Sequence, residues 1–238
     1  MANTEGIDIS GAQRGCVDWA KLDPAIRFVV VKLTEGVSYE DGAARDHCAG
    51  VRTAGRDLAG YHYLRVRAGK SQDARQQAHD AAAVATRERC EWLGLDVESE
   101  GNAGARPVEY ATAVMDFAHE WRSIVETPLV LYTYPGLWGS LGAMPMELAE
   151  LPLWIAHYAP PSPKVPIVPA PWSEWFLWQY AASASASVIG RVDGVRGMVD
   201  RNVFRGSRDE MRARLGLRVA PLPNLADDPR VKTQKEGD

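Results

Sequence analysis

The chain has 238 residues, of which 46% are hydrophobic and 24% charged, and its formal net charge is -4 at pH 7. These values are typical of a soluble globular protein with one sizeable core, and they exclude disordered and fibrous chains. The mild acidity, without any run of Lys or Arg, argues against a nucleic-acid partner. Since no apolar run approaches the roughly 18 residues of a membrane span, we expect no membrane insertion.

Local motifs for export, disulfides and metals are missing from the sequence. The amino terminus, MANTEGIDIS, has neither a basic region nor an apolar stretch, so we predict no signal peptide. The three cysteines, Cys16, Cys48 and Cys90, are widely spaced, which favours buried or free thiols over a disulfide. The five histidines form no HExxH or similar pair. We therefore expect no metal site.

Short apolar runs rich in β-formers alternate with longer stretches of helical periodicity along the chain, which predicts βα units. Eight such runs suit a closed barrel of strands. The predicted strands cover residues 6–9, 27–33, 58–64, 92–97, 129–133, 153–157, 175–180 and 199–203.

Helices are predicted between and after these strands. Ser71 is placed to cap a helix that buries one face of alanines, Ala74, Ala78, Ala82 and Ala85. Pro107 suits the first position of a helix that runs to about residue 125. Its apolar stripe is expected to face the sheet and consists of Ala111, Val114, Ala118, Trp121 and Val125.

The carboxyl-terminal boundary of the folded domain is predicted at residue 216. Ser207 and Glu210 form a capping box for a last helix, and Gly216 follows its final apolar residue as a stop signal. Residues 217–238 are rich in proline and charge and have too little periodic apolar content to pack. We therefore expect a single domain over residues 1–216 and a polar tail or linker over residues 217–238.

The most informative local motif is the D-x-E pair in WLGLDVE, formed by Asp96 and Glu98. Residues two apart on a strand project to the same side, about 6.6 Å from each other at about 3.3 Å per residue. Like charges at that range raise one pKa, so that one carboxyl holds a proton near neutrality. Protonation of a glycosidic oxygen requires such a group. Taken alone, the pair could equally end a strand or face solvent.

Two further acids are expected to join this pair. Asp8 ends the first predicted strand, in GIDIS, and Asp200 lies on the last one, in GMVDRNVF. First and last strands are neighbours in a closed barrel, and chemistry collects at the carboxyl ends of barrel strands. Four acids thus converge on one mouth, which a purely structural protein has no reason to do because each must be desolvated or paired.

Aromatic residues are expected to gather at the same rim, because they fall at or near strand ends. Flat rings with a polar handle suit the apolar faces and polar edges of sugars, although core packing remains the alternative for any single Trp. The residues are Tyr61, Tyr63, Tyr132, Trp154, Tyr158, Trp175, Trp178 and Tyr180.

Taken in order, the motifs resemble those of the glycoside hydrolase family 25 lysozymes, the Chalaropsis-type or Cellosyl-like muramidases. They are GIDIS, the DW of Asp18 and Trp19, VVVKLTEG, GYHYL, GLDVE, PLVLYTY, LWIAHY, WQY and GMVDRNVF, and they extend from Gly6 to about Leu215. The resemblance implies an α/β fold, a single-domain irregular TIM-like (β/α) barrel. It also implies cleavage of the β-1,4 bond between N-acetylmuramic acid and N-acetylglucosamine, without a metal or organic cofactor.

Residue roles follow from the same resemblance. Glu98 matches the general acid/base, Asp96 the paired acid that assists the second half of the reaction, and Asp8 and Asp200 the other acids of the groove floor. The substrate groove is implied to include Tyr63, Tyr132, Trp154, Tyr158 and Gln179. The chain departs from the usual GAYHF-like and IKATEG motifs with GYHYL and VKLTEG. Neither departure removes a carboxylate, but the first puts the sugar pose at Tyr63 in doubt.

Two alternatives concern the reaction and two concern the function. The nucleophile is either a carboxylate, which needs the acids about 5 to 5.5 Å apart, or the acetamido oxygen of the substrate, oriented by Asp96. We favour the second. Both routes retain the anomeric configuration. A non-catalytic glycan-binding barrel is the first rival function. The second is a chitinase-like barrel, but the residues before Asp96, Trp92 to Leu95, lack the extra acids of its motif.

The expected partner is bacterial peptidoglycan, and we expect a monomer. Lytic chemistry without a signal peptide suggests that the protein reaches the wall by phage-type release, on a particle or by non-classical export. The tail over residues 217–238 is then a candidate attachment to a phage or other particle.

Overall fold

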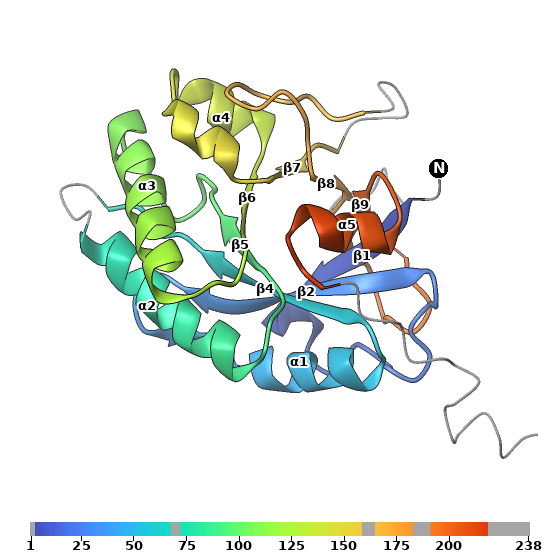
Figure 1. Ribbon diagram of the computed structural model, residues 1–238. Coiled ribbons are helices and arrows are strands. Elements are labelled where there is room, and N and C mark those ends of the chain that lie inside the picture. The colour runs from blue at the N-terminus through green and yellow to red at the C-terminus, as the bar shows by residue number, and fades with distance from the viewer. Residues whose placement is uncertain (1–2, 68–71, 159–164, 183–190, 219–238) are drawn as a thin grey trace, which may run out of the picture.

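The computed structural model describes residues 3–67, 72–158, 165–182 and 191–218, and within them the strands form one sheet that closes on itself (Figure 1). All eight predicted strands are present, with ends that differ by no more than two residues. The strands are β1 (Thr4–Ile9), β2 (Ile26–Glu35), β3 (Tyr39–Glu40), β4 (Asp57–Tyr63), β5 (Leu93–Asp96), β6 (Leu129–Thr133), β7 (Leu153–Ala156), β8 (Leu177–Ala181) and β9 (Asp200–Phe204).

The barrel closes because β1 pairs with both β2 and β9. From β1 through β2 and β4 to β8, each strand is parallel to the next, whereas β9 runs antiparallel to both of its neighbours. The predicted closed barrel is therefore confirmed, with one reversed strand that sequence patterning did not predict. The short strand β3 was not predicted either, and it forms an antiparallel hairpin with β2 outside the barrel ring.

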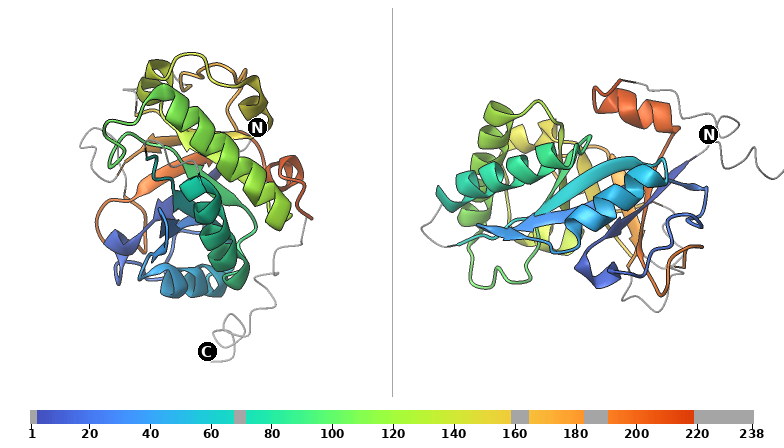
Figure 2. Two further views of the ribbon diagram at one scale, coloured as in Figure 1. Left: turned by 90° about the vertical axis from the view of Figure 1, so that its left-hand side faces the viewer. Right: turned by 90° about the horizontal axis from the view of Figure 1, so that it is seen from below.

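Helices cover one part of the barrel wall more completely than the rest (Figure 2). α1 packs on β2 and β4, while α2 packs on β2 and against α3. In the described parts of the β7–β8 and β8–β9 connections there is no helix, which makes the barrel irregular. The helices are α1 (Ala44–Thr53), α2 (Gln72–Arg87), α3 (Pro107–Ile124), α4 (Pro135–Ser140) and α5 (Arg208–Arg214).

The helix predictions hold for α2 and only in part for α3. All four predicted alanines of α2 are buried, while the proposed cap, Ser71, lies outside the described residues. In α3, Ala111 and Val125 of the predicted stripe are only partly buried. The buried face is wider than the stripe because α3 packs against α2 as well as the sheet, and it consists of Tyr110, Ala113, Val114, Phe117, Ala118 and Trp121.

α5 packs against the end of the barrel at which the parallel strands begin. Its capping box forms as predicted, since the Glu210 carboxylate accepts from the Ser207 N–H at 2.7 Å. The predicted stop, Gly216, follows the helix with φ 70°. Leu217 and Arg218 are still bonded to the helix, the latter through its carbonyl, which accepts from Arg212 Nε at 2.9 Å. Residues 219–238 of the predicted tail lie outside the described residues.

The barrel interior is apolar towards this end and polar towards the other. Alternation along β2 sends Phe28 and Val30 inward, where they meet Trp92 and Trp154. The Phe28 ring fills the space beside Gly6, where an added Cβ would come within 2.3 Å of it. Aromatic packing thus forms a solid floor, on which the polar side chains of the mouth rest.

The cysteines are free thiols, as expected, with Cys48 and Cys90 buried and Cys16 partly exposed. Among the residues that the structure describes, no helix is both long and apolar enough to cross a bilayer.

Candidate active site

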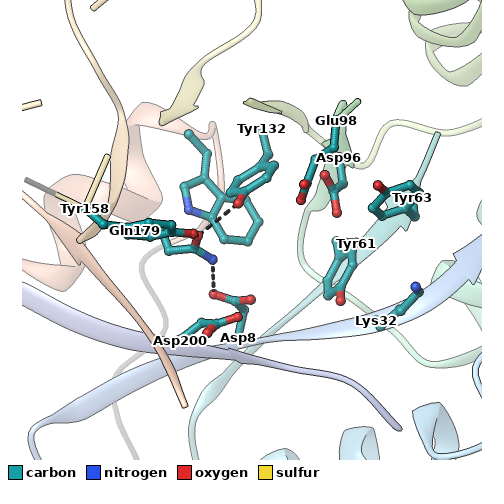
Figure 3. Close-up of a pocket in the computed structure, with 11 residues that line it drawn as sticks. Asp8, Lys32, Tyr61, Tyr63, Asp96, Glu98, Tyr132, Tyr158, Gln179 and Asp200 are labelled. Carbon is teal, nitrogen blue, oxygen red and sulfur yellow. Dashed lines mark hydrogen bonds between the residues drawn. The ribbon is translucent and has the colours of Figure 1, made fainter. Parts of the chain in front are cut away.

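A cavity opens at the mouth of the barrel, where the parallel strands end (Figure 3). All nine site residues predicted from the sequence line it, and Lys32 and Tyr61 line it in addition. The lining consists of Asp8, Lys32, Tyr61, Tyr63, Asp96, Glu98, Tyr132, Trp154, Tyr158, Gln179 and Asp200. The sequence therefore predicted the composition of the cavity, although the role of each residue in a reaction stays a prediction.

Asp8 and Asp200 meet across the seam where the barrel closes. They are directly opposite residues of the β1–β9 ladder. Because β9 is antiparallel, its first residue, rather than its last, lies beside the end of β1. Figure 3 shows this pair on one side of the cavity and the Asp96–Glu98 pair on the other. Four acids thus line one mouth as two pairs.

Neutral amides hold the Asp8 carboxylate. Its Oδ2 accepts from Gln179 Nε2 at 2.8 Å and from Asn202 Nδ2 at 2.7 Å. Burial, followed by the charge of Asp200, raises the pKa of Asp8 well above its ordinary value, and the two amide hydrogen bonds oppose this only in part. Asp8 therefore retains its proton more readily than an exposed aspartate would.

The two amides also fix the aromatic side chains of the cavity. Gln179 Oε1 accepts from the hydroxyl of Tyr132 at 2.9 Å and from that of Tyr158. Asn202 Oδ1 accepts from Trp154 Nε1 at 2.8 Å. With each amide oriented by an N–H or O–H on one side and Asp8 on the other, the rings and the carboxylate are held in one hydrogen-bonded network.

Trp154 forms the floor of the cavity rather than an open platform. Only 2% of its surface is exposed, and its ring meets that of Tyr132 edge to face at 4.7 Å between centroids. It also packs against Trp92 at 6.2 Å. Much of its surface therefore serves core packing, the alternative that had been open for any single Trp.

Asp96 and Glu98 form the second acidic pair. Asp96 is the last residue of β5 and is 6% exposed, whereas Glu98 is more accessible. Burial and then the charge of Glu98 raise the pKa of Asp96 well above its usual range. Burial also raises the pKa of Glu98, although a hydrogen bond with Asp96 opposes the rise. The pair thus holds a proton at a pH where isolated carboxyls have lost theirs.

Asp96 Oδ1 is buried and, among the described residues, has no hydrogen-bond partner. Buried polar atoms in folded proteins are nearly always bonded, so an exception at the edge of a cavity calls for an explanation. A ligand N–H placed in the cavity would satisfy this oxygen.

Lys32 is the one basic residue among those that line the cavity, and it lies against the Tyr63 ring. Lys32 Nζ is 2.6 Å from Glu35 Oε2 and lies 5.1 Å from the centre of the Tyr63 ring. The Tyr63 hydroxyl donates to the Glu100 carbonyl at 2.8 Å, and burial followed by the charge of Glu98 raises its pKa. Tyr61 had been expected at the rim with the other aromatics, and strand alternation could also have revealed Lys32, because it is two residues from the inward Val30 on β2.

Three predicted rim aromatics lie elsewhere. Trp178 and Tyr180 alternate with the inward Gln179 on β8 and so point away from the cavity. Trp178 Nε1 donates to the His157 carbonyl at 2.9 Å, and the Tyr180 hydroxyl donates to Glu5 at 2.7 Å. Trp175 packs against Trp178. Placing these three at the sugar-binding rim was wrong, because proximity to a strand end does not decide the face on which a side chain lies.

No group of three or more His, Cys, Asp or Glu among the described residues is arranged to hold a metal ion. The cavity acids are bonded to amides and to one another instead. What this arrangement can do is hold and transfer protons beside a ligand with apolar faces and polar edges.

Comparisons with known proteins agree with this chemistry. The family model of the glycosyl hydrolases family 25 matches residues 7–189. Lysozyme M1 of Streptomyces globisporus is 29% identical over 213 residues, which cover 87% of this chain and 69% of that protein. The N,O-diacetylmuramidase of Chalaropsis sp. is 26% identical over 213 residues, 81% of this chain and 97% of that one.

A solved structure shows the same fold. The bacterial lysozyme from Streptomyces coelicolor superposes with a TM-score of 0.75 at 27% identity, over 90% of this chain and 98% of that one. With the family model matched over well more than half of the sequence, the chain belongs to glycosyl hydrolases family 25 and is a glycoside hydrolase.

Proposed function

We propose that this protein is a peptidoglycan hydrolase, an N-acetylmuramidase that cuts the β-1,4 bond between N-acetylmuramic acid and N-acetylglucosamine. The observation that carries the proposal is the cavity lined by two acidic pairs and by aromatic side chains. Relatives named lysozyme and N,O-diacetylmuramidase support the choice of substrate. The family match also disfavours a chitinase-like barrel.

In the proposed reaction Glu98 is the general acid and then the general base. Its raised pKa keeps a proton available for the leaving oxygen as positive charge develops on the sugar ring. After the bond to that oxygen breaks, the Glu98 carboxylate takes a proton from water, which attacks the anomeric carbon. Glu98 suits this exchange because it is the more accessible acid of its pair.

Asp96 is proposed to orient the acetamido group of the sugar. Its unpartnered Oδ1 would accept the acetamido N–H, while the acetamido oxygen attacks the anomeric carbon. That hydrogen bond favours the ionised form of Asp96 and leaves the shared proton on Glu98. Two displacements at one carbon retain its configuration. An inverted product in an NMR time course would exclude both this route and direct attack by a carboxylate.

The remaining cavity residues are proposed to bind the glycan. Tyr63 and Tyr158 present partly exposed rings to the sugars, and Tyr132 and Trp154 line the floor. Gln179 keeps two of these rings and Asp8 in register. Asp8 and Asp200 would stabilise the positive charge of the transition state from the opposite side.

The decisive experiment compares the wild type with Glu98→Gln on purified bacterial cell walls. We expect the wild type to clear the suspension and Glu98→Gln to lose at least about a hundredfold in rate, within the range that acid–base catalysis contributes. Glu147→Gln is the matched control, because this exposed acid does not line the cavity and its charge is not among those that shift the pKa of Glu98. It should clear walls at the wild-type rate.

Mass spectrometry of the products after borohydride reduction identifies the bond that is cut. The proposal requires reduced muramic acid at the new ends, whereas reduced glucosamine would assign a different cleavage. Equal clearing by the wild type and Glu98→Gln would refute the role of Glu98, and a wild type that binds walls without clearing them would favour the glycan-binding alternative.

The site of action is proposed to be the bacterial cell wall, with the protein acting as a monomer. Phage-type release, delivery on a particle or non-classical export, and attachment through residues 217–238, remain predictions from the sequence.

A further inference from the structure

The main chain at Glu98 lies beyond the reach of the barrel ladder. The last ladder-like bonds along β5 are the Leu64 N–H to the Asp96 carbonyl and the Val97 N–H to the Tyr132 carbonyl, both 2.9 Å. After them the chain leaves the sheet for the loop that precedes α3. Side chains rather than neighbouring strands therefore fix the position of Glu98.

Two side chains converge on the Glu98 carbonyl. Asn102 Nδ2 donates to it at 2.9 Å and the Tyr110 hydroxyl donates to it at 3.2 Å. Both residues are 3% exposed. The carbonyl of the proposed acid is thus held from the loop and from α3 at once.

Asn102 connects this loop to the segment after β4. Its Nδ2 donates to the Leu64 carbonyl at 2.9 Å, and its Oδ1 accepts from the Val66 N–H at 2.9 Å. One buried amide therefore bonds three main-chain groups from two loops at the mouth. The segment after β4 directly follows Tyr63, so both edges of this part of the cavity are tied to each other through Asn102.

A second buried amide provides a natural comparison. Gln77, which is 1% exposed, donates to the Arg65 carbonyl at 2.8 Å and accepts from the Arg65 N–H at 3.0 Å and from the His62 ring at 2.9 Å. It makes two hydrogen bonds to the same segment after β4 and one to His62 on β4 itself, but none to the loop that carries Glu98. Asn102 and Gln77 thus resemble each other in structural role and differ in their link to Glu98.

We propose that Asn102, assisted by Tyr110, is a positioning residue that fixes the Glu98 carboxyl relative to Asp96 and the bound glycan. The proposal rests on the proposed role of Glu98. The physical reason is that a displacement of about 1 Å of a catalytic group is enough to lower a rate by about a hundredfold. Without Asn102, no strand neighbour would limit such a displacement.

The test measures kcat and KM on soluble, un-cross-linked glycan strands from purified walls, scored as new reducing ends per folded molecule. Asn102→Ala is expected to lower kcat by about ten- to a hundredfold and to leave KM within about twofold. Tyr110→Phe keeps the ring but loses one bond, so a fall of about fivefold in kcat is expected. It keeps the proposal testable if Asn102→Ala fails to fold.

Gln77→Ala is the matched control, because it also leaves three buried polar groups without their partner. We expect it to lower the melting temperature as much as Asn102→Ala does, with kcat and KM within about twofold of the wild type. An equal loss of kcat in both alanine variants, or unchanged kcat in both Asn102→Ala and Tyr110→Phe, would overturn the positioning role.

The proposed function is judged separately in the same assay. Wild-type activity together with an inactive Glu98→Gln establishes the acid, whatever the Asn102 variants do. If Glu98→Gln cuts the strands as fast as the wild type, the role of Glu98 fails and no role remains for Asn102 to support, whereas an inactive wild type would refute the proposed function itself.

Discussion

The two buried acids of the cavity, Asp8 and Asp96, form no ion pair with a described basic residue, unlike the buried Asp57 at the opposite end of the barrel. Asp8 receives hydrogen bonds from two amides, and Lys32 is the one basic residue among those that line the cavity. Amide donors satisfy a carboxylate without cancelling its charge, so burial still raises its pKa. The arrangement fits a site that must retain protons, and it costs stability at neutral pH.

Replacing Asp96 with Asn should therefore stabilise the fold while removing activity. The pKa of Asp96 is raised by burial and by Glu98, so the native state binds this proton more tightly than the unfolded chain does. Stability from this group is greatest at low pH and is lost as pH rises above about 3.9, the unfolded value. We expect a melting temperature about 2–4 °C higher at pH 7, the effect of 1 kcal/mol at this size.

Calorimetry at several pH values tests this expectation. The difference in melting temperature between Asp96→Asn and the wild type should shrink as the pH is lowered towards 4. Glu100→Gln, which replaces an exposed acid, should not raise the melting temperature. If Asp96→Asn were less stable than the wild type at pH 7, burial of the ionised Asp96 carboxylate would not be the destabilising factor that its raised pKa indicates.

Sequence reasoning found the acids of the site but not what holds them. Asp96 and Glu98 are uninformative alone and stand out only together with Asp8 and Asp200, which lie on the first and last strands and so meet at the seam of a closed barrel. Asn202 and Asn102 carry no comparable signal, since isolated amides occur in many loops and strands. Their roles depend on atoms that are distant in sequence, such as the Asp8 carboxylate.

At the scale of elements, strand existence was predictable and strand direction was not. Alternation and β-propensity locate β9 within one residue of its observed start, yet the same pattern suits either direction. Only the pairing with β1 and β8 fixes it as antiparallel. The misplaced Trp178 and Tyr180 have a different cause, because both alternate with the inward Gln179 along β8 and therefore lie on its outer face.

His62 joins three elements beneath the mouth. It lies on β4, is fully buried, and bonds Thr34 of β2 at 2.8 Å and Gln77 of α2 at 2.9 Å. It faces away from the cavity because it alternates with Tyr61 and Tyr63 along β4. Burial lowers its pKa from 6.5 to about 4, with the bond to Gln77 opposing that change. The neutral ring is therefore part of the packing of α2 on the sheet.

Acid should weaken this packing. Because the folded pKa is below the unfolded one, the contribution of His62 is complete above about pH 6.5 and is lost as the pH falls towards 4. A pKa lowered by about 2.5 corresponds to about 3 kcal/mol. We expect His62→Gln to be less stable than the wild type at pH 7 and to approach it by pH 4, as measured by urea unfolding. A difference that is constant with pH would contradict the buried neutral ring.

At the scale of the whole molecule, an ion-pair cluster fastens α5 to the end of the barrel opposite the cavity. Arg212 is 5% exposed and bonds Asp57, the first residue of β4, at 3.1 Å and Glu91 at 2.6 Å. Arg208 bonds the same aspartate. The last helix is thus bonded to the start of β4 and to the loop before β5, and it covers the apolar floor beneath the cavity.

Arg212→Ala should lower the free energy of unfolding by about 3 kcal/mol, near the lower end of the range for a broken buried pair, because Arg208 still bonds Asp57. Arg122→Ala removes an exposed pair with Glu150 and should change stability by less than about 1 kcal/mol. Urea unfolding of both variants makes the comparison. Equal effects would mean that α5 is held by its apolar face, which includes Met211 and Leu215, rather than by the cluster.

The seam between β1 and β9 joins the first and last strands of the barrel, so the cavity is completed only when both are present. The hydrogen bond from Asn202 to Asp8 joins residues 194 positions apart. Asp8 is therefore synthesised long before β9, which carries its partner Asn202. A nascent or prematurely ended chain without β9 has an open barrel, lacks Asp200, and leaves Asp8 with Gln179 as the one remaining donor of its two amides. The two acidic pairs of the cavity therefore come together only after β9 has been synthesised.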